Sequence, residues 1–443
     1  MTSPARHLRP EPVLFLLWAM ELLRLVWSPP ELRTAAGVLM ILYTALALPR
    51  IRRATILLCL PLATVAVTLA AFFHHWEGIF RGFENASVFM AFFGSIVLLR
   101  AVADQRPEIH RARLLFTGLR AEQTNGAFLI GAHLIGSVLV VGAMAILAPI
   151  LKRDADDETR RRAGEVSQRG MCLAALWSPF WVAAAFTAQQ IPGVPAWEIM
   201  SLGVSMAAIG LVLAHMMYAR NVGLANLWQA ILGFAPIVPS VAACALIIAG
   251  LSSVAGLSTL QALIGTIPFI AVLSVVVSRQ PIARRVASET RRGSSRVADE
   301  IIVVTTALIL GRVLEYTVHQ VGLSAMIGAL DLPPWAVIGC VIGAITAAAL
   351  CGIHQLVSII VVLVVFMPLD TGIADTVMME AALVGWCFAS MIGITAVSTA
   401  TASAMFRVPR TQLIYGPNLR FVAAYGILSV ILLSLVNGLF FTA

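Results

Sequence analysis

Residues 334–369 read PWAVIGCVIGAITAAALCGIHQLVSIIVVLVVFMPL, two apolar runs separated by a glycine and a histidine. Each run approaches the roughly 20 residues that cross a bilayer as a helix. The break, at residues 352–354, falls inside the apolar stretch. Irregular backbone at membrane depth is tolerated only where protein buries it or where it lines an aqueous cavity. We therefore expect either two short crossings or one re-entrant hairpin, with a functional break between its helices.

The whole chain has the composition of a membrane protein. Of its 443 residues, 60% are hydrophobic and 12% are charged, about half of the roughly 25% charged residues in soluble domains. Apolar runs long enough to form membrane segments recur at 12–28, 34–49, 54–74, 84–103, 126–151, 170–190, 195–218, 226–250, 258–278, 300–320, 334–351, 353–369, 374–406 and 420–441. This pattern predicts an all-α polytopic membrane protein with about 11–14 membrane segments. It excludes a soluble enzyme, a nucleic-acid-binding module and a secreted disulfide scaffold.

Basic residues are concentrated in a few loops between the apolar runs. The basic loops are 104–124, 152–169, 279–299 and 407–420, and the loops without Lys or Arg are 191–194, 251–257, 321–333 and 370–373. The positive-inside rule places the basic loops in the cytoplasm and the others in the periplasm, as expected for a multi-pass protein of the bacterial inner membrane. The net charge of +8 therefore reflects orientation and not nucleic-acid binding.

The run 126–151 conflicts with this assignment, because it lies between two basic loops. A single crossing would place one of those loops outside the cell. We therefore expect a hydrophobic segment between residues 104 and 195 to enter the membrane and return to the same side. Such re-entrant segments place backbone amides and helix ends at mid-membrane, where a substrate ion can be held.

A weak internal repeat relates two parts of the chain. Residues 171–192, MCLAALWSPFWVAAAFTAQQIP, align with 347–368, AAALCGIHQLVSIIVVLVVFMP. In this alignment Ser178 lies opposite His354, and each stretch ends in a proline. We expect two inverted-repeat-like halves, with boundaries at 84–250 and 251–443, after N-terminal transmembrane helices in 1–83. Interrupted segments at corresponding positions of two halves indicate a transporter site.

Polar residues near the expected breaks form a candidate solute site. Its members are Ser178, Pro179, His354, Gln355, Ser358, Thr395, Ser398 and Thr399. Proline fits best at a first helical position, so Pro179 should begin a helix whose free N–H groups, with the preceding serine hydroxyl, can bind an anion. The other residues come from the glycine break and from the hydroxyl-rich stretch GITAVSTATASA, at 393–404. A kinked helix, an interhelical hydrogen bond of the histidine or close helix packing would explain the same residues without a solute.

Charged residues inside the apolar runs are candidates for ion coupling, because ionisable groups in a membrane are usually functional. They are Arg312, Glu315, Glu198 and Glu380. The first two are three residues apart and could form a simple ion pair, and the other glutamates could merely stabilise helix starts. The six cysteines lie in apolar runs without a CxxC spacing, and the sequence has no HExxH, GxSxG or Walker motif, so we expect no metal site, no cofactor and no enzyme.

The stretch Leu176-Trp177-Ser178-Pro179 places a small polar tip at the end of one helix, before an alanine-rich helix that ends in Pro192. It resembles the hairpin of the divalent anion/sodium symporters. These belong to the ion transporter superfamily, with arsenite permeases, sodium/proton antiporters and the large subunits of TRAP transporters. The resemblance covers residues 84–440 in architecture. It implies inverted repeats, a scaffold domain, elevator-type movement and often a homodimer.

The two tips differ from those of that superfamily. Its Ser-Asn-Thr tip corresponds here to Ser178-Pro179-Phe180, and the second tip is His354-Gln355-Leu356. Few hard oxygen ligands remain to bind Na⁺, whereas a histidine and several glutamates can carry a proton. We therefore expect coupling to H⁺ in preference to Na⁺.

These observations favour a secondary active transporter, or permease, that moves a small anionic solute. Its expected partners are that solute, H⁺ or Na⁺, the lipid bilayer and a second copy in a homodimer, with no nucleic acid. One alternative is a membrane-embedded enzyme such as a glycan polymerase or ligase, which would need catalytic groups in the outer loops. The other is a non-transporting membrane assembly subunit.

Overall fold

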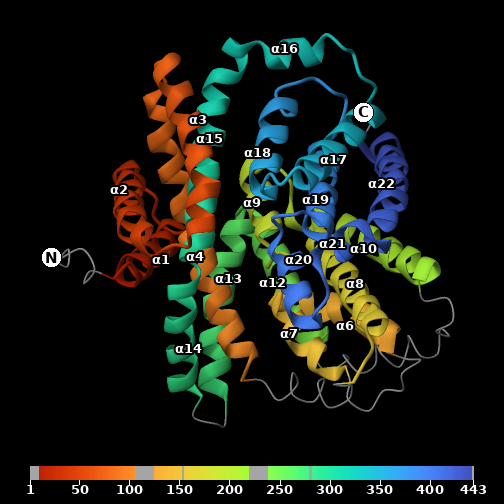
Figure 1. The fold of residues 1–443 in the computed structure, drawn as a ribbon. Helices are drawn as coiled ribbons and strands as arrows, with labels where there is room; N and C mark the ends of the chain where they lie inside the picture. Colours follow the sequence, from red (N-terminus) through yellow and green to blue (C-terminus); the bar gives the residue numbers. More distant parts are fainter. Residues whose placement is uncertain (1–8, 106–123, 152–153, 219–237, 279–281, 442–443) are drawn as a thin grey trace. The chain divides into compact units, whose positions relative to one another are not determined.

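The computed structural model describes residues 9–105, 124–151, 154–218, 238–278 and 282–441 (Figure 1). These residues form helices and no strand. Eight of the described helices are long and apolar enough to cross a membrane, and four shorter apolar helices accompany them. The all-α polytopic prediction is therefore confirmed. Most of the predicted basic loop 104–124 and the first half of the predicted segment 226–250 lie outside the described residues.

The chain packs into two compact units, and each is assembled from separate stretches of sequence. Unit 1 comprises residues 1–105, 263–331 and 364–369, and unit 2 comprises 106–262, 332–363 and 370–443. This division by packing is a different property from the predicted repeat-like halves, which stay a prediction.

Unit 1 is organised around the long helix α4. Its helices are α1 (Glu11–Arg24), α2 (Pro30–Ala47), α3 (Arg53–Phe72), α4 (Trp76–Ala103), most of α13 (Thr259–Val277), α14 (Ala283–Arg296), α15 (Ala298–Val321) and α16 (Leu323–Gly328), with the 3-10 turn η2 (Leu48–Arg50). Helix α4 packs against α1, α2, α14 and α15 (Figure 1). The approach of α4 to α15 requires Gly82, because a Cβ there would lie 2.5 Å from the Cα of Ile309.

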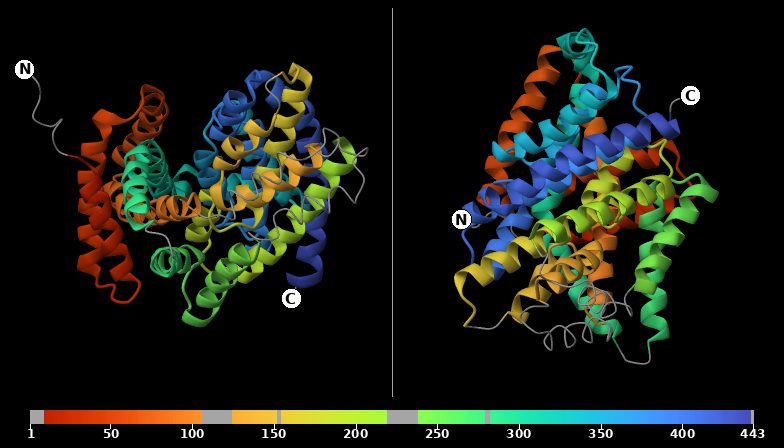
Figure 2. Two further views of the ribbon diagram at one scale, coloured as in Figure 1. Left: turned by 90° about the horizontal axis from the view of Figure 1, so that it is seen from below. Right: turned by 90° about the vertical axis from the view of Figure 1, so that its right-hand side faces the viewer.

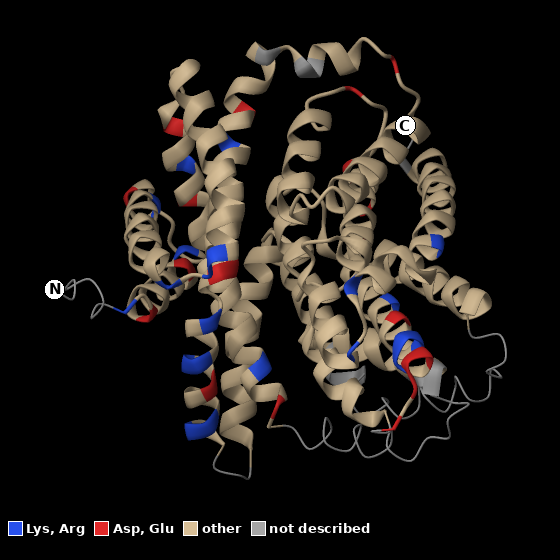
Figure 3. Ribbon diagram, viewed as in Figure 1, with Lys and Arg blue, Asp and Glu red and all other residues tan. Residues whose placement is uncertain are grey.

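Helix α14 corrects the prediction of a basic loop at 279–299. Residues 283–296 are helical, and Val286, Thr290 and Ser294 are buried at four-residue spacing, which forms a stripe facing α4. The arginines on the other faces of α14 are exposed; their positions are blue on the ribbon in Figure 3. The arginine content concealed the short buried stripe that makes this segment a helix.

Unit 2 is built around α19, which is buried from Thr376 to Ile392. Its helices are α6 (Thr124–Leu139), α7 (Gly142–Leu147), α8 (Asp157–Leu173), α9 (Val182–Gln190), α10 (Ala196–Tyr218), α12 (Val238–Ala255), α17 (Pro334–Leu350), most of α18 (Gln355–Phe366), α19 (Asp375–Ile392), α20 (Val397–Phe406), α21 (Arg410–Tyr415) and α22 (Pro417–Val436), with the 3-10 turns η4 (Ala148–Ile150) and η5 (Ala174–Leu176) and the short π-helix η6 (Asn437–Phe441). Helix α19 packs against α8, α9, α10, α17 and α22. Helices α10 and α22 also pack against each other (Figure 2).

Helices α6 and α8 run in the same direction. The Cβ of a residue at Gly170 would lie 2.0 Å from the carbonyl oxygen of Leu129, and beyond the end of α8 Ser178 bonds to Ser137, near the end of α6. The chain reverses after Val140, whose φ is +52°, and α7 packs back on α6. Helices α6 and α8 therefore both start on the same side of unit 2. This is the geometry that the parity argument predicts for 126–151, and its placement in a membrane stays a prediction.

The prediction of a loop at 152–169 was wrong from residue 157 onward, because these residues form a helix. Helix α8 starts at Asp157, with Asp156 as its N-cap, and is buried from Ala163 to Leu173. The run 374–406 is interrupted, because α19 ends at Ile392 and α20 starts at Val397. Further breaks separate η5 from α9 and α17 from α18.

Candidate functional site

The starts of α18 and α20 meet at the last turn of α19. The Ser390 hydroxyl of α19 donates to Oε1 of Gln355, the first residue of α18, over 3.3 Å. The Ser398 hydroxyl of α20 donates to the backbone carbonyl of Ser390. We call Ser390, Gln355, Ser398 and Thr399 the Ser390 junction.

This junction brings positive helix ends to one place. The first N–H groups of a helix have no intrahelical partner and carry a partial positive charge. Helix α20 starts after Ala396 without a side-chain cap, and the backbone N–H of Leu356 in α18 bonds to the ring of His354 over 3.3 Å. An anion at the junction would therefore meet two helix N-termini and several hydroxyl groups.

A chain of buried polar side chains leads away from the junction. The amide nitrogen of Gln168 in α8 donates to the Met391 carbonyl over 2.8 Å and to the Thr399 hydroxyl over 2.9 Å. Asn418 of α22 donates to Oε1 of Gln168 over 3.1 Å, and Arg169 donates to Oδ1 of Asn418 over 2.8 Å. Each link has a defined donor and acceptor, so this polar chain is a fixed network.

Arg169 is the largest buried side chain of this network, with 1% of its surface exposed. Its guanidinium lies 3.4 Å from a carboxylate oxygen of Glu165 and 3.9 Å from the ring centroid of Tyr218. A buried charge is tolerated only with such partners, and the planar guanidinium can use a carboxylate, an amide and a ring face together. Glu165 continues the chain outward, because it also binds Arg161 over 2.7 Å.

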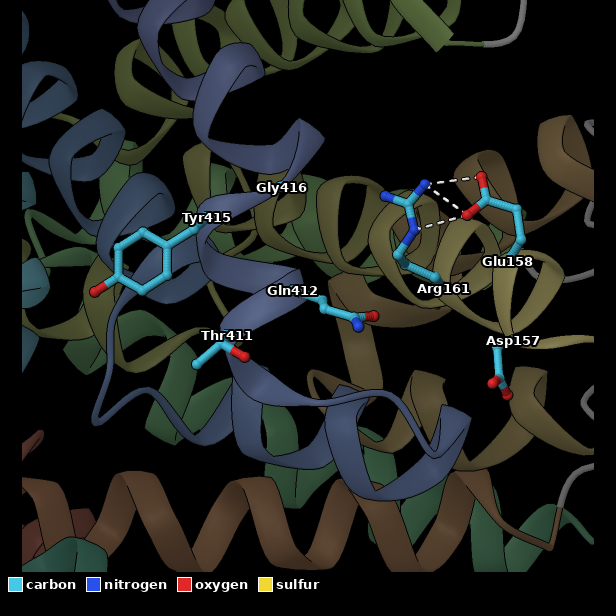
Figure 4. Close-up of a pocket in the computed structure, with 7 residues that line it drawn as sticks. All are labelled: Asp157, Glu158, Arg161, Thr411, Gln412, Tyr415 and Gly416. Atoms are coloured by element: carbon cyan, nitrogen blue, oxygen red, sulfur yellow. Dashed lines mark hydrogen bonds and ion pairs between the residues drawn. The ribbon is translucent and has the colours of Figure 1, made fainter.

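An open cavity of about 660 Å³ lies at the outer end of this chain (Figure 4). It is lined by Asp157, Glu158 and Arg161 of α8 and by Thr411, Gln412, Tyr415 and Gly416 at α21. Hydrogen bonds from Arg161 and Arg162 lower the pKa of Glu158. The polar chain thus runs from this cavity, through Arg161 and Glu165, to the Ser390 junction.

The first predicted tip is closed by hydrogen bonds. The Ser178 hydroxyl donates to the carbonyl of Ser137, and the Trp177 indole donates to Nε2 of His133 over 3.1 Å. The other ring nitrogen of His133 lies 3.1 Å from the carbonyl oxygen of Gly170. Pro179 lies in the break and does not begin a helix, because α9 starts at Val182. In the described residues, the hydrogen bonds of the Ser178 side chain stay within this tip and α6.

The second predicted tip is more open. Gly352 has φ +84°, Cys351 and Ile353 are exposed, and His354 is half-buried. Ser358 is buried and bonds back to the His354 carbonyl over 3.4 Å. Gln355 is the residue of this tip that reaches the Ser390 junction.

The hydroxyl-rich stretch divides between two environments. Ser398 and Thr399 are buried in the Ser390 junction, whereas Thr395 is exposed in the turn before α20. Three of the predicted solute residues, Gln355, Ser398 and Thr399, are therefore brought together. Contact of any predicted residue with a solute stays a prediction.

The predicted coupling residues lie in different settings. Arg312 and Glu315 of unit 1 form an ion pair of 2.5 Å, with each side chain about a third exposed. Glu198 of unit 2 accepts a hydrogen bond of 2.7 Å from Thr376. Glu380 is fully buried, and neither of its carboxyl oxygens has a hydrogen-bond partner among the described residues.

Sequence reasoning missed the residues that hold the polar chain together. These are Glu165, Gln168, Arg169, Ser390 and Asn418. A usable signal was present, because Asp156 followed by two acidic residues is a helix start. A helix from there would have placed Glu165, Gln168 and Arg169 on adjacent positions of one face.

No protein-family model matches the chain, and no curated protein matches it. Among solved structures, the chain is similar to the YdaH transporter of Alcanivorax borkumensis, whose crystal structure reveals an unusual topology. The TM-score is 0.53 with 13% sequence identity, over 87% of this chain and 98% of the YdaH chain. At this identity the likeness concerns the fold: this chain has a fold also found in a membrane transporter.

Proposed function

We propose that this protein is a secondary active transporter that moves a small anionic solute across the bacterial inner membrane, coupled to protons. The observation that carries the proposal is the Ser390 junction, where the starts of α18 and α20 meet hydroxyl groups at a helix break. Broken helices that present their N-termini to a solute are a recurrent feature of secondary transporters. The fold shared with a transporter supports the same proposal.

In this proposal the negative charge of the solute is held by helix N-termini and by the hydroxyls of Ser390 and Ser398, whose protons leave Gln355 and the Ser390 carbonyl to bond to the solute. The polar chain through Gln168, Asn418 and Arg169 fixes the relative positions of α8, α20 and α22 around the junction. Because α8, α19 and α20 belong to one compact unit, the site can move as a body. This supports an elevator-type mechanism and membership of the ion transporter superfamily, in which a homodimer is also expected.

The alternative functions have less support. A glycan polymerase or ligase needs reactive groups on an outer surface, whereas the polar cluster of unit 2 is buried between helices. An assembly subunit has no need for a buried chain of charged and amide side chains that leads to a helix break. Retention of such costly buried groups favours a functional site.

Transport by the purified protein in liposomes tests the proposal. A panel of labelled acetate, benzoate, succinate and phosphate covers monocarboxylate, aromatic, dicarboxylate and inorganic anions. We expect one class to exchange across the membrane and to accumulate under an imposed pH gradient. The variant Ser390→Ala should reduce this uptake, whereas the control variant Ser295→Ala, on the exposed side of α14, should not. Absence of uptake for every anion, with correctly folded protein, would refute the proposal.

A further inference from the structure

Glu380 differs from the other buried acids of this protein. Among the described residues, four glutamates are buried, namely Glu21, Glu84, Glu165 and Glu380. The first three bind arginines, over 2.6 Å for Glu21, 2.9 Å for Glu84 and 2.7 Å for Glu165. Glu380 is 0% exposed and has no partner for either oxygen among the described residues. An isolated carboxylate is very costly in such surroundings, so this side chain is accommodated as a neutral acid.

In the part of the chain that the structure describes, no Lys or Arg is recorded as a partner of Glu380. Its titratable neighbours are Cys387, on the same helix, and the phenol of Tyr425 on α22, which donates to the Met206 carbonyl over 2.6 Å. Helices α9, α17 and α20 carry no Lys, Arg, Asp, Glu or His.

The charged groups of the other helices packed on α19 are paired with each other, exposed, or placed in a distant turn. Glu165 and Arg169 of α8 bind each other in the polar chain. Arg410 of α21 and Arg420 of α22 are exposed, and His215 lies in the last turn of α10. The remaining acid of these helices is Glu198, in the first turn of α10. It approaches the N-terminal end of α19.

Thr376 connects Glu198 to Glu380. The Thr376 hydroxyl donates to Glu198 over 2.7 Å, and Thr376 precedes Glu380 by one turn of α19. Residues four apart on a helix are neighbours on one face, with Cβ atoms about 5–6 Å apart. Glu198 is half-buried. The three residues therefore form a short row of polar groups that leads from the surface of unit 2 to the buried acid.

The outer end of this route lies where α10 and α19 begin. The preceding segments, 191–195 and 370–374, contain no Lys or Arg. The first segment approaches the start of α19, because a Cβ at Gly193 would lie 4.0 Å from a carboxylate oxygen of Asp375. The positive-inside rule assigns this end to the periplasm. The polar chain to the Ser390 junction starts instead at α8, beside basic residues.

We infer that Glu380 binds the coupled proton and that Glu198 and Thr376 form its route from the arginine-free end of unit 2. Once Glu380 has released its proton, an O–H bond of Glu198 breaks and its proton passes to the Thr376 oxygen, while the original Thr376 proton forms the new O–H bond of Glu380. A hydronium ion from the aqueous phase then reprotonates Glu198. Glu380 and Ser390 are ten residues apart on α19, about 15 Å along the helix. The inference deepens the proposed function and rests on it, because it names the proton site of that transporter.

Infrared spectroscopy of the protein in liposomes, without any solute, tests the proton site. We expect the wild type to show the C=O stretching band of a neutral carboxylic acid at neutral pH. Glu380→Gln should remove this band, and the control Glu315→Gln, which changes a paired and partly exposed acid, should retain it. After transfer to D₂O, Glu198→Gln and Thr376→Val should slow the deuterium shift of the band by about tenfold. A band that persists in Glu380→Gln, or exchange that is unchanged in both route variants, would overturn the inference.

Transport measurements with the anion found in the liposome panel provide the second test. Glu380→Gln should abolish accumulation driven by a pH gradient and retain exchange of labelled for unlabelled anion at equal pH. Loss of both activities in folded protein, or retention of both, would contradict a proton-carrying role. If the infrared results are as expected and no anion moves, the proposed function fails while the proton-binding assignment stands.

Discussion

The break at residues 177–181 and the Ser390 junction use their polar groups in opposite ways. At the first break, Ser178, Trp177 and His133 bond to one another or to nearby backbone, and these hydrogen bonds connect the tip with α6 and with the last turn of α8. At the junction, hydrogen bonds connect α8, α18, α19 and α20 and continue to the buried ion pair of Arg169 and Glu165. The hydrogen bonds of the first break fasten neighbouring helices together, whereas those of the junction bring several helix ends to the place where we propose that a solute binds.

The largest expected effect comes from removing the charge at the centre of the polar chain. Arg169→Met leaves Glu165 with a missing partner inside unit 2 and should lower the free energy of unfolding by about 3–5 kcal/mol. Chemical denaturation in detergent measures this loss. The control Arg292→Met removes an arginine whose side chain is 70% exposed and should change stability by less than about 0.5 kcal/mol. Equal effects of the two variants would mean that the polar chain of side chains contributes nothing to the stability of the protein.

The second prediction compares histidines at the two tips. His133→Leu removes both hydrogen bonds of a buried ring and leaves the Trp177 indole unpaired, so the free energy of unfolding should fall by about 1–3 kcal/mol. His354→Leu changes a half-buried ring at an open break and should have a smaller effect on stability but a larger effect on anion uptake. Denaturation and uptake measured on the same preparations separate the roles. The contrast fails if His133→Leu impairs uptake in fully folded protein and His354→Leu does not.

The third prediction concerns a single hydroxyl of the Ser390 junction. Thr399→Val removes an acceptor of Gln168 and should cost about 0.5–1.5 kcal/mol of stability while reducing anion uptake. Thr317→Val is the matched control, because Thr317 is equally buried and its hydroxyl bonds only within α15. If both variants transport normally, Thr399 has no place in the solute site.

The smallest expected effect lies at the start of α8, far from both breaks. The backbone N–H of Thr159 bonds to Asp156 over 2.6 Å and lowers the pKa of this N-cap carboxyl. A lowered pKa in the folded state adds stability at neutral pH, and that stability is lost as the pH falls below the ordinary value of 3.8. Asp156→Asn should therefore lower the melting temperature slightly at pH 7, and this difference should shrink as the pH falls below 3.8. A difference that grows as the pH falls would contradict the sign of the shift.

The sequence predicted the features that depend on hydrophobic runs and their interruptions. The glycine break at 352–354 and the reversal within 126–151 could be anticipated from run length and from the sidedness of arginines. The membrane-length helices followed from composition alone. These signals are local, so they do not require knowledge of which helices pack together.

The polar chain could not be anticipated in the same way. Gln168 and Asn418 are 250 residues apart in sequence, and nothing local relates them. The arginines of 160–162 and Arg169 were read as one solvated loop, although Arg169 is buried and the others lie nearer the surface. A count of arginines gives net basicity, whereas burial depends on the face of the helix that carries each residue. Ser390 was missed for a similar reason, because a lone serine in an apolar helix carries no signal.

The most direct test of the account is a cryo-electron microscopy map of the protein in lipid nanodiscs with the anion that shows the greatest uptake in liposomes. We predict density for that anion at the Ser390 junction, within hydrogen-bonding distance of the Ser390 and Ser398 hydroxyls and at the first turns of α18 and α20. Density confined to the cavity between α8 and α21, or to the break at 177–181, with nothing at the junction, would contradict the account.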